Sequence, residues 1–484
     1  MKLELRPDQR NWLNEGITHL RKGNDPIMMQ AQTGFGKTFT AARLGRHILL
    51  NRKSVMFTAH RQEIFLQAVE HFARVLEPPE GREDDPLFKM RLIATKQLQS
   101  VVIGEMIREE TIHRHAANGG VHMAMIDTLK ARFKRAQKSG GSIEVPDYLI
   151  IDEAHHAMAP GWLAVLMHFY KNGCKIIGLT ATPERLDGKG LSQKVGGIFK
   201  TLVEGPPMLK LIEQGFLSPI RLFCPKTAKP APENTPLLKG DYNPKSLDEI
   251  CKALEGDAVL EYKKIMPGKR ALAFCHSVPR CKEFTEKFNA AGIPATWVDG
   301  TMKVRERKDR LDALRNGDVL ILCSKDVIGE GMDIPCVDGA LLLRHTMSLS
   351  VYMQQVGRTS RIFEGKECGF IIDMVRNSYR HGHPCHPKNW KFHGSERRDD
   401  DAEIKSNVKI CQFCGSPNVR IAAVCINCGA PFLTKKRTQE EIPGELVEFG
   451  IGGIKISPEA GENVHRWREA QNALRRFQMD LDIE

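Results

Sequence analysis

A candidate phosphate-binding loop lies near the N-terminus and has the sequence Ala31-Gln32-Thr33-Gly34-Phe35-Gly36-Lys37-Thr38. An apolar run precedes it and a helix-period stretch follows it, which is the strand–loop–helix order that such loops require. Glycine lets backbone N–H groups curl around an anion, and the helix N-terminus adds positive charge. We therefore expect this loop to hold a nucleotide phosphate through Thr33, Gly34, Gly36 and Lys37, and Mg²⁺ through Thr38. The strict pattern has glycine in place of Ala31, and a glycine turn without a ligand is the alternative.

A pair of carboxylates, Asp152 and Glu153, follows the apolar run Tyr148–Ile151. Ligands of open α/β sheets lie at the carboxyl ends of the strands, so we expect this pair at the same edge as the phosphate loop. Asp152 would hold Mg²⁺, and Glu153 would orient and deprotonate an attacking water. An acidic strand end that caps a helix is the alternative.

Two arginines far along the chain, Arg358 and Arg361, could complete such a site. Phosphoryl transfer needs positive charge on the developing γ-phosphate, which guanidinium groups supply. If these arginines belong to a second α/β domain, the nucleotide lies in a cleft between the domains. Closing the cleft would complete the site, and opening it after hydrolysis could push a bound nucleic acid along. A solvated helix face on which the arginines pair with Glu364 is the alternative.

Two Cys-x-x-Cys pairs, which comprise four of the 13 cysteines, have the spacing of zinc ligands. The metal would stabilise a segment too short for a core of its own, and its ligands would be Cys411, Cys414, Cys425 and Cys428. A redox pair and free thiols are the alternatives. A second cluster, for which we favour a surface loop or a contact with the core over a metal site, consists of His381, His383, Cys385 and His386.

The elements that must position these residues are strands that alternate with helices up to about residue 375. Their apolar runs are nearly continuous, which is typical of parallel sheets covered on both faces. The first set is Ile27–Gln30, Val55–Thr58, His122–Met125, Tyr148–Ile151 and Ile176–Leu179. The second set is Ala271–Phe274, Ala295–Val298, Val319–Cys323, Ala340–Leu343 and Phe370–Ile372.

The expected architecture is α/β, with two tandem parallel-sheet domains, a small zinc ribbon and a helical tail. We place these parts at residues 1–207, 208–395, 405–435 and 436–484. Residues 204–219 are turn-rich, and residues 225–245 indicate an exposed loop or linker. In the tail, one face of a predicted amphipathic helix, which we expect to dock on the core, carries Val464, Trp467, Leu474 and Phe477.

Charge and composition narrow the class of protein. The net charge of +12 and the pI near 9.0 make an acidic partner such as nucleic acid plausible. We find no apolar run of the length that a membrane helix needs and no apolar segment of a secretory signal, so we expect neither a membrane helix nor a signal peptide. The odd number of cysteines and their scatter favour a reducing compartment. We therefore expect a cytoplasmic protein.

Several motifs, taken in order, resemble those of the superfamily 2 helicases, whose fold is a pair of RecA-like domains and whose second motif here reads DEAH. The segment Arg6-Pro7-Asp8-Gln9 resembles the family's adenine-reading motif, with Arg6 and Gln9 as nucleotide contacts. The segment Thr180-Ala181-Thr182-Pro183 resembles the motif that couples hydrolysis to strand binding through Thr180 and Thr182. The resemblance also assigns catalytic roles to Gln354, Arg358 and Arg361, and nucleotide contacts to Gly331 and Asp333.

The same resemblance implies contacts with a nucleic-acid backbone. The residues concerned are Thr58, His60, Arg61, Thr128, His276 and Ser324. Short polar side chains at strand ends suit hydrogen bonds to phosphate oxygens, which position a strand without reading its sequence. Capping of the following helix is the alternative for each of them.

A helicase core followed by paired cysteines is similar to the RadD-type DNA repair helicases of bacteria and phages. This similarity implies an ATP-dependent DNA helicase or translocase of repair or recombination that uses ATP, Mg²⁺ and Zn²⁺. It also implies single-stranded or branched DNA as substrate, cooperation with single-stranded DNA-binding protein, and a bacterial or phage origin. The alternatives are an ATP-switched nucleic-acid clamp that recruits partners without unwinding, and an RNA helicase.

Overall fold

The structure is a computed structural model, which describes residues 4–76, 85, 90–94, 120–185, 187–225, 237–238, 241–242, 257–328, 334–394, 408–410, 417–419, 431 and 446–449. The chain forms two compact units. The first comprises Met1–Pro206 and Asn389–Arg397, and the second comprises Pro207–Lys388 and Arg398–Glu484. Within the described residues each unit contains a seven-stranded sheet, which agrees with the expected two α/β domains.

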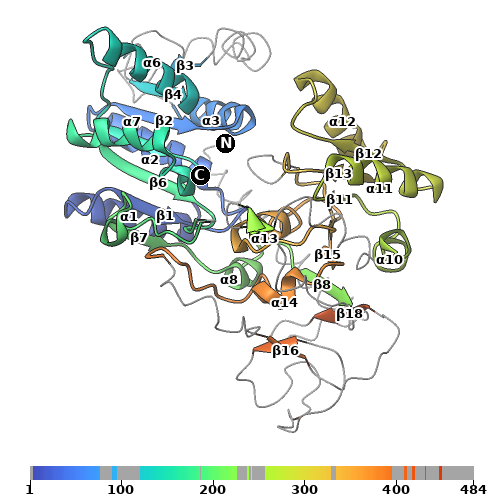
Figure 1. Cartoon of the computed structure of the whole chain (residues 1–484). Helices are drawn as coiled ribbons and strands as arrows, with labels where there is room; N and C mark the ends of the chain where they lie inside the picture. Colours follow the sequence, from blue (N-terminus) through green and yellow to red (C-terminus); the bar gives the residue numbers. More distant parts are fainter. Residues whose placement is uncertain are drawn as a thin grey trace, which may run out of the picture. The chain divides into compact units, whose positions relative to one another are not determined.

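The sheet of the first unit is parallel in all its described strand pairs. Its strands, in spatial order, are β3 (Met90–Ile93), β4 (Val121–Met125), β2 (Val55–Ala59), β5 (Tyr148–Ile151), β6 (Lys175–Thr180), β1 (Ile27–Gln30) and β7 (Thr201–Glu204). One face is covered by α1 (Pro7–Arg21), α2 (Lys37–Leu50) and α3 (Gln62–Val75), and the other by α6 (Ile126–Lys138) and α7 (Pro160–Lys171) (Figure 1). Because both faces are covered, β1, β2 and β4 are buried along their whole length.

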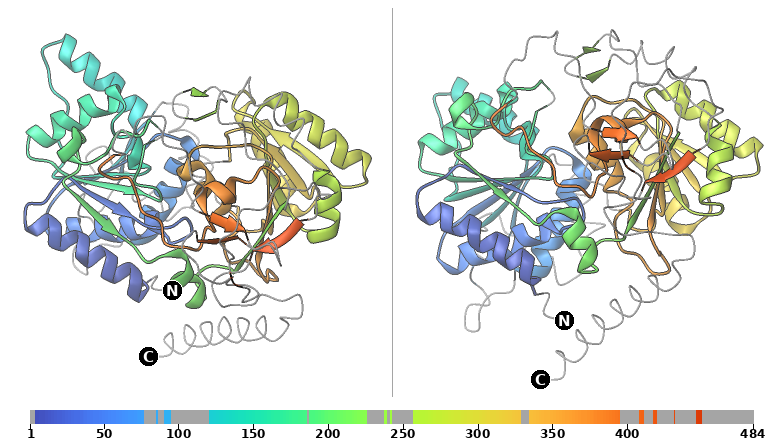
Figure 2. Two further views of the ribbon diagram at one scale, coloured as in Figure 1. Left: turned by 60° about the horizontal axis from the view of Figure 1, so that its bottom comes forward. Right: turned by 90° about the horizontal axis from the view of Figure 1, so that it is seen from below.

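The second unit repeats this plan with an added edge strand. Its strands, in spatial order, are β12 (Ala295–Val298), β13 (Ile321–Ser324), β11 (Ala271–Phe274), β14 (Gly339–Leu342), β15 (Gly369–Asp373), β8 (Ile220–Pro225) and β18 (Leu446–Phe449). The described pairs are parallel except that of β18 with β8, which is antiparallel (Figure 2). The apolar core on one face lies under α10 (Ala258–Ile265) and α11 (Val278–Ala290).

The second unit contains four further described helices and two further strand pairs. Its other helices are α8 (Met208–Glu213), α12 (Val304–Asn316), α13 (Leu349–Val356) and α14 (Asn377–His381). Two further antiparallel strand pairs are β9 (Leu237–Leu238) with β10 (Asp241–Tyr242), and β16 (Val408–Ile410) with β17 (Pro417–Val419).

The predicted strands are confirmed, since every apolar run that we assigned to a strand overlaps a strand of the structure. Of the strands in the two seven-stranded sheets, β3, β7, β8 and β18 were missed. The segment 204–219 contains a helix, α8, in addition to turns. Pro207 occupies the N-cap of α8, so a proline that indicated a turn in fact begins a helix.

Two segments differ from the predicted domain plan. The second domain was expected to continue to residue 395, but the chain returns to the first unit at Asn389. There Phe392 is buried in the core beside α7, and its carbonyl accepts hydrogen bonds from the N–H groups of Leu191 (2.8 Å) and Ser192 (3.1 Å). In the predicted exposed loop 225–245, Asp241 is buried and accepts hydrogen bonds from Met347 N (2.7 Å) and Thr346 Oγ1 (2.9 Å).

Other predictions fall outside the described residues. These are the four zinc-type cysteines, the amphipathic face between Val464 and Phe477, and the nucleotide contacts Gly331 and Asp333. None of the helices in the described part of the chain has the length and apolarity needed to span a bilayer.

Candidate active site

The phosphate loop connects β1 to α2 in the first unit. Gly34 and Gly36 have φ values of +85° and +88°, a left-handed conformation that favours glycine. The Lys37 ammonium donates hydrogen bonds to the carbonyls of Ala31 (3.0 Å) and Gln32 (3.4 Å), so the side chain folds back over the loop. These glycines and this lysine are the groups that the sequence predicted for a phosphate.

The predicted adenine-reading segment is attached to this loop through Phe35. Gln9 Nε2 donates to the carbonyl of Phe35 (2.7 Å), and the Arg6 guanidinium donates to the same oxygen. The buried Phe35 ring packs edge-on against Trp12, with ring centroids 5.2 Å apart. At Gly36 a Cβ atom would lie 2.7 Å from Gln9 Nε2, so this close approach also requires glycine. Sequence reasoning missed Phe35, although a large apolar residue among small and polar ones was a usable signal.

The acidic pair lies at the carboxyl end of β5. Asp152 is 5% exposed and Glu153 is 9% exposed. Burial raises the pKa of Asp152 to about 6, and the neighbouring Glu153 charge acts in the same direction, whereas Lys37 opposes it. Thr38 Oγ1 is 3.4 Å from Asp152 Oδ2, which joins the phosphate loop to the acidic pair. These oxygen donors suit Mg²⁺, and a cation there would offset buried negative charge.

Thr180 joins the loop and the acidic pair through the strand between them, β6. Its backbone carbonyl accepts a hydrogen bond from Ala31 N (3.0 Å). Its hydroxyl lies 3.1 Å from the carbonyl of Thr182 and 3.1 Å from His155 Nδ1. His155 Nδ1 also lies 3.4 Å from Glu153 Oε2, so a proton on this nitrogen would face both the Thr180 hydroxyl and the carboxylate. The predicted coupling residues therefore lie in contact with the acidic motif.

The predicted nucleic-acid contacts of the first unit differ in accessibility. His60 and Arg61 follow β2 and are partly exposed, and Arg61 Nε donates to His60 Nε2 (3.3 Å). Thr128 is half-buried in the first turn of α6. Thr58 is 0% exposed, and its hydroxyl has no hydrogen-bond partner among the described residues. The Thr58 side chain is therefore covered in this structure, and its role as a strand contact stays a prediction.

The predicted nucleic-acid contacts of the second unit are buried. Ser324, at the end of β13, is 1% exposed, and His276 after β11 is also buried. Both side chains are buried in this structure, and their role as strand contacts stays a prediction. Sequence reasoning placed them correctly at strand ends but could not give their exposure.

The arginine segment lies at the end of α13 in the second unit. Gln354 and Arg358 are buried, and Arg361 is half-buried. Burial lowers the pKa of the Arg361 guanidinium to about 10. Ser218 holds the segment in place, since its N–H donates to Ser360 O (2.7 Å) and its hydroxyl to Arg361 O (3.1 Å). The burial of Arg358 excludes the alternative of a solvated helix face.

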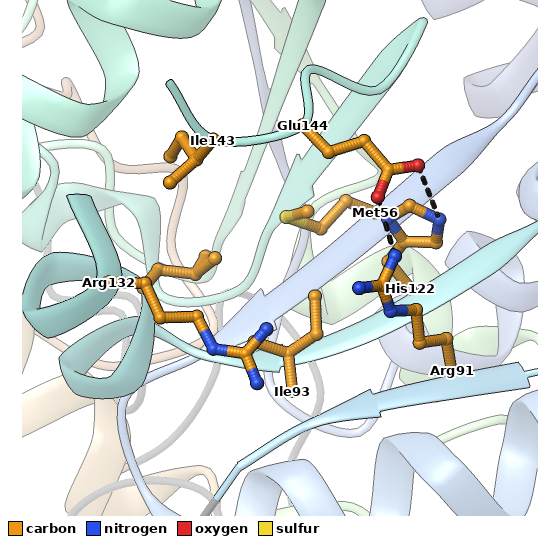
Figure 3. Close-up of a pocket in the computed structure, with 8 residues that line it drawn as sticks. Met56, Arg91, Ile93, His122, Arg132, Ile143 and Glu144 are labelled. Atoms are coloured by element: carbon orange, nitrogen blue, oxygen red, sulfur yellow. Dashed lines mark hydrogen bonds and ion pairs between the residues drawn. The ribbon is translucent and has the colours of Figure 1, made fainter. Parts of the chain in front are cut away.

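The first unit also has a cavity of about 170 Å³ between α6 and the strands β2, β3 and β4 (Figure 3). Met56, His122 and Arg91 lie side by side across these strands. Glu144 pairs with Arg91 and lies 3.8 Å from His122, so a carboxylate already compensates charge there. The cavity is near the amino ends of the strands, away from the predicted site residues.

The histidine–cysteine cluster after α14 packs into the second unit. His383 and Cys385 are buried, which favours the predicted contact with the core. Burial lowers the pKa of His383 to about 3 and raises that of Cys385 to about 12. Within the described ranges, no group of three or more His, Cys, Asp or Glu side chains is arranged to hold a metal ion.

Two protein-family models match the chain. The model described as "Type III restriction enzyme, res subunit" matches residues 2–185, and "Helicase conserved C-terminal domain" matches residues 247–363. A 51.5 kDa protein of a Lactococcus phage is 26% identical over 89% of this chain and 84% of its own length. The protein named helicase 22 of Sulfolobus islandicus filamentous virus is 24% identical over 77% of this chain and 64% of its own length.

Two solved structures share the fold. A fragment described as an HsdR subunit of a type I restriction enzyme from Vibrio vulnificus has a TM-score of 0.54 and 18% identity, and covers 80% of this chain and 67% of its own. The restriction-modification enzyme LlaBIII has a TM-score of 0.50 and 19% identity, and covers 77% of this chain and 28% of its own. The restriction-enzyme model over the first unit, the helicase model over the second and the relatives named helicases identify the chain as a member of helicase superfamily 2, whose members are ATP-dependent enzymes that act on nucleic acid.

Proposed function

We propose that the chain is an ATP-dependent DNA helicase or translocase of the RadD type that acts in DNA repair or recombination. The observation that supports this most strongly is the meeting of three strand ends in the first unit. The phosphate loop, Thr180 and Asp152 lie at the carboxyl ends of the adjacent strands β1, β6 and β5, and Thr38 of the loop lies 3.4 Å from Asp152.

Each residue has a defined role in this proposal. Lys37 and the loop N–H groups bind the β- and γ-phosphates, and Glu153 orients the attacking water. Thr38 and Asp152 hold Mg²⁺, which when bound neutralises charge on the phosphates. Arg358 and Arg361 of the second unit stabilise the transferred phosphoryl group, and Gln354 supports them.

DNA is the proposed polymer for two reasons. The net charge of +12 suits a polyanion, and the model that matches the first unit is named after a restriction enzyme, a class that acts on DNA. RNA is the second candidate, because an RNA helicase of Mycobacterium tuberculosis, DeaD, is 23% identical over 71% of this chain. A clamp that binds ATP without productive movement is the third.

A zinc ribbon and a partner complete the proposal. The strands β16 and β17 pair in antiparallel register, so the residues that connect them include both Cys411 and Cys414. This supports a first pair of thiolates for Zn²⁺, with Cys425 and Cys428 as the second pair. Metal analysis of the purified chain should give about one zinc per molecule. The proposed protein partner is single-stranded DNA-binding protein.

Phosphate release tests the proposal. Wild-type chain and Lys37→Ala are compared without nucleic acid and with single-stranded DNA, duplex DNA or RNA of equal length. We expect DNA to stimulate the wild type and the variant to lose about 100-fold or more in every condition. Lys53→Ala, which removes an exposed lysine paired with Asp147, is the matched control and should behave as wild type. Equal stimulation by RNA would favour the second candidate, and release at the variant's level in every condition would exclude an ATPase.

A further inference from the structure

Four aromatic rings connect the predicted nucleic-acid segment of the first unit to Glu153. The ring of His60 lies 4.9 Å from that of His156 and 6.0 Å from that of Trp162, measured between centroids. His156 in turn lies 4.1 Å from His155, whose Nδ1 is 3.4 Å from Glu153 Oε2. We call the rings of His60, Trp162, His156 and His155 the ring ladder. The ring ladder connects His60, which was predicted to contact nucleic acid, with Glu153, which was predicted to orient the attacking water.

The two ends of the ring ladder have different environments. His60 is partly exposed and accepts a hydrogen bond from Arg61. This end of the ring ladder therefore consists of residues that are predicted to contact nucleic acid. Trp162 belongs to α7 and is buried in the apolar core, and the rings of His60 and His156 pack against it. Trp162 cannot move without opening a gap in the core, so a displacement of His60 is expected to displace the ring of His156.

The backbone of Glu153 depends on the turn that carries this ladder. Its φ of +50° lies in the left-handed region, where a residue with a side chain persists only if its surroundings hold it. A 3-10 turn (Ala154–His156) follows immediately, and His156 N donates to the carbonyl of Glu153 at 3.1 Å. The position of His156 therefore affects both the backbone and, through His155, the carboxylate of Glu153.

We propose that His156 is a positioning residue that makes the orientation of Glu153 depend on nucleic acid at His60 and Arg61. The inference rests on the proposed function, in which these two residues meet a phosphate backbone. A phosphate that accepts the Nε–H of Arg61 competes with His60 Nε2 for that donor. His60 then reorients against His156 and Trp162, and the turn carries the change to Glu153.

The first test separates stimulation from hydrolysis itself. The stimulation ratio is the rate of phosphate release with saturating single-stranded DNA divided by the rate without it. We expect His156→Ala to lower this ratio by about fivefold or more, while the DNA concentration for half-maximal stimulation changes by less than about threefold. His156→Phe keeps a ring at this position and should restore at least about half of the wild-type ratio.

A matched control lies in the same unit. His168 on α7 packs against Phe133, with ring centroids 5.0 Å apart, and is not part of the ring ladder. His168→Ala should keep the wild-type ratio. The inference is overturned if His156→Ala keeps it too, or if that variant lowers the basal and stimulated rates by the same factor, since the residue would then only support the fold. A wild type that no nucleic acid stimulates would instead defeat the proposed function itself.

Tryptophan fluorescence gives an independent readout. The chain contains five tryptophans, so the Trp162 signal is the difference between wild type and Trp162→Phe. Titration with single-stranded DNA without ATP should change this signal in the wild type. In His60→Ala the change should be absent, even at DNA concentrations at which fluorescence anisotropy shows that the variant is saturated with DNA. An identical DNA-induced change in wild type and Trp162→Phe would show that the ladder does not respond, and would overturn the inference.

Discussion

In the first unit the phosphate loop and the acidic pair lie at the ends of neighbouring strands and approach each other, whereas in the second unit the predicted catalytic residues lie in a segment at the end of α13. Buried acidic groups dominate the first set, and the pKa of Asp152 is raised to about 6 even with Lys37 nearby. Guanidinium groups dominate the second set, and burial lowers the pKa of Arg361 to about 10. The two shifts have opposite signs and the same leading cause, burial of charge.

This difference indicates that each unit lacks charge of the sign that a Mg²⁺–nucleotide would supply. A cation would stabilise the ionised form of Asp152, and phosphate oxygens would stabilise the charged guanidinium groups. A buried charge costs free energy until a ligand compensates it. A Mg²⁺–nucleotide bound as in the proposed function would compensate both kinds of buried charge, and the following changes test the contrast between the two sets.

The largest effect is expected from the arginine segment. Arg358→Ala should reduce kcat for ATP hydrolysis by about 1000-fold, because a guanidinium group that stabilises the transferred phosphoryl group is lost. Binding of a fluorescent ATP analogue should weaken much less. Arg315→Ala, which removes an exposed arginine paired with Asp312, is the control. A kcat within about tenfold of wild type would show that Arg358 does not stabilise the transferred phosphoryl group.

A smaller effect is expected from the segment that returns to the first unit. Phe392→Ala should destabilise that unit by about 3–5 kcal/mol, because a buried ring leaves a cavity. Hydrogen exchange measured by mass spectrometry should show faster exchange in peptides of the first unit and unchanged exchange in the second. Phe288→Ala removes a buried ring from the second unit and should show the reverse pattern. Faster exchange in the second unit alone for Phe392→Ala would contradict the assignment of this segment.

The smallest expected effect is a pH dependence of the free energy of unfolding, which has opposite signs for the groups considered in the two units. Burial lowers the pKa of His345 to about 4 and of His383 to about 3, so below pH 6.5 the unfolded chain binds protons that the folded second unit does not. Between pH 7 and 5 the second unit should lose about 2 kcal/mol for each histidine. The raised pKa of Asp152 has the opposite consequence, because the folded first unit binds a proton near pH 6 and the unfolded chain only near pH 4.

Unit-resolved hydrogen exchange without nucleotide and Mg²⁺ measures this response. His345→Gln should remove its share of the pH dependence in the second unit, and Asp152→Asn the share of Asp152 in the first. If acid destabilised the first unit as strongly as the second, and neither variant changed this, the stated burial of these groups would be wrong.

The sequence predicted the sheets well because their strands are continuous apolar runs. Ala271–Phe274 and Ala295–Val298 have the same bounds in prediction and structure. The strand β8 was missed, since Pro219 precedes it, Pro225 ends it, and it is recognisable only from its pairing with β15 and β18. The return of Phe392 to the first unit was also missed, because that contact joins residues far apart in the chain and leaves no local pattern.

The candidate site was predictable to a similar degree. Residue types and spacing identified Lys37 and Asp152, because the phosphate loop and the acidic pair each follow a recognisable strand. The sequence could not show that His156 lies between His60 and His155, since that contact depends on how the end of β2 meets the turn after β5. It also gave no measure of exposure, which is why Thr58 and Ser324 were predicted as contacts although both are buried.

The central claim is that the acidic pair of the first unit hydrolyses ATP in response to nucleic acid. The most direct measurement is steady-state phosphate release by wild type and Glu153→Gln, each with and without single-stranded DNA, in parallel with DNA binding. The account predicts DNA-stimulated release by the wild type, a loss of about 100-fold or more in the variant, and retained DNA binding. Release by Glu153→Gln at the wild-type rate with DNA present would contradict it.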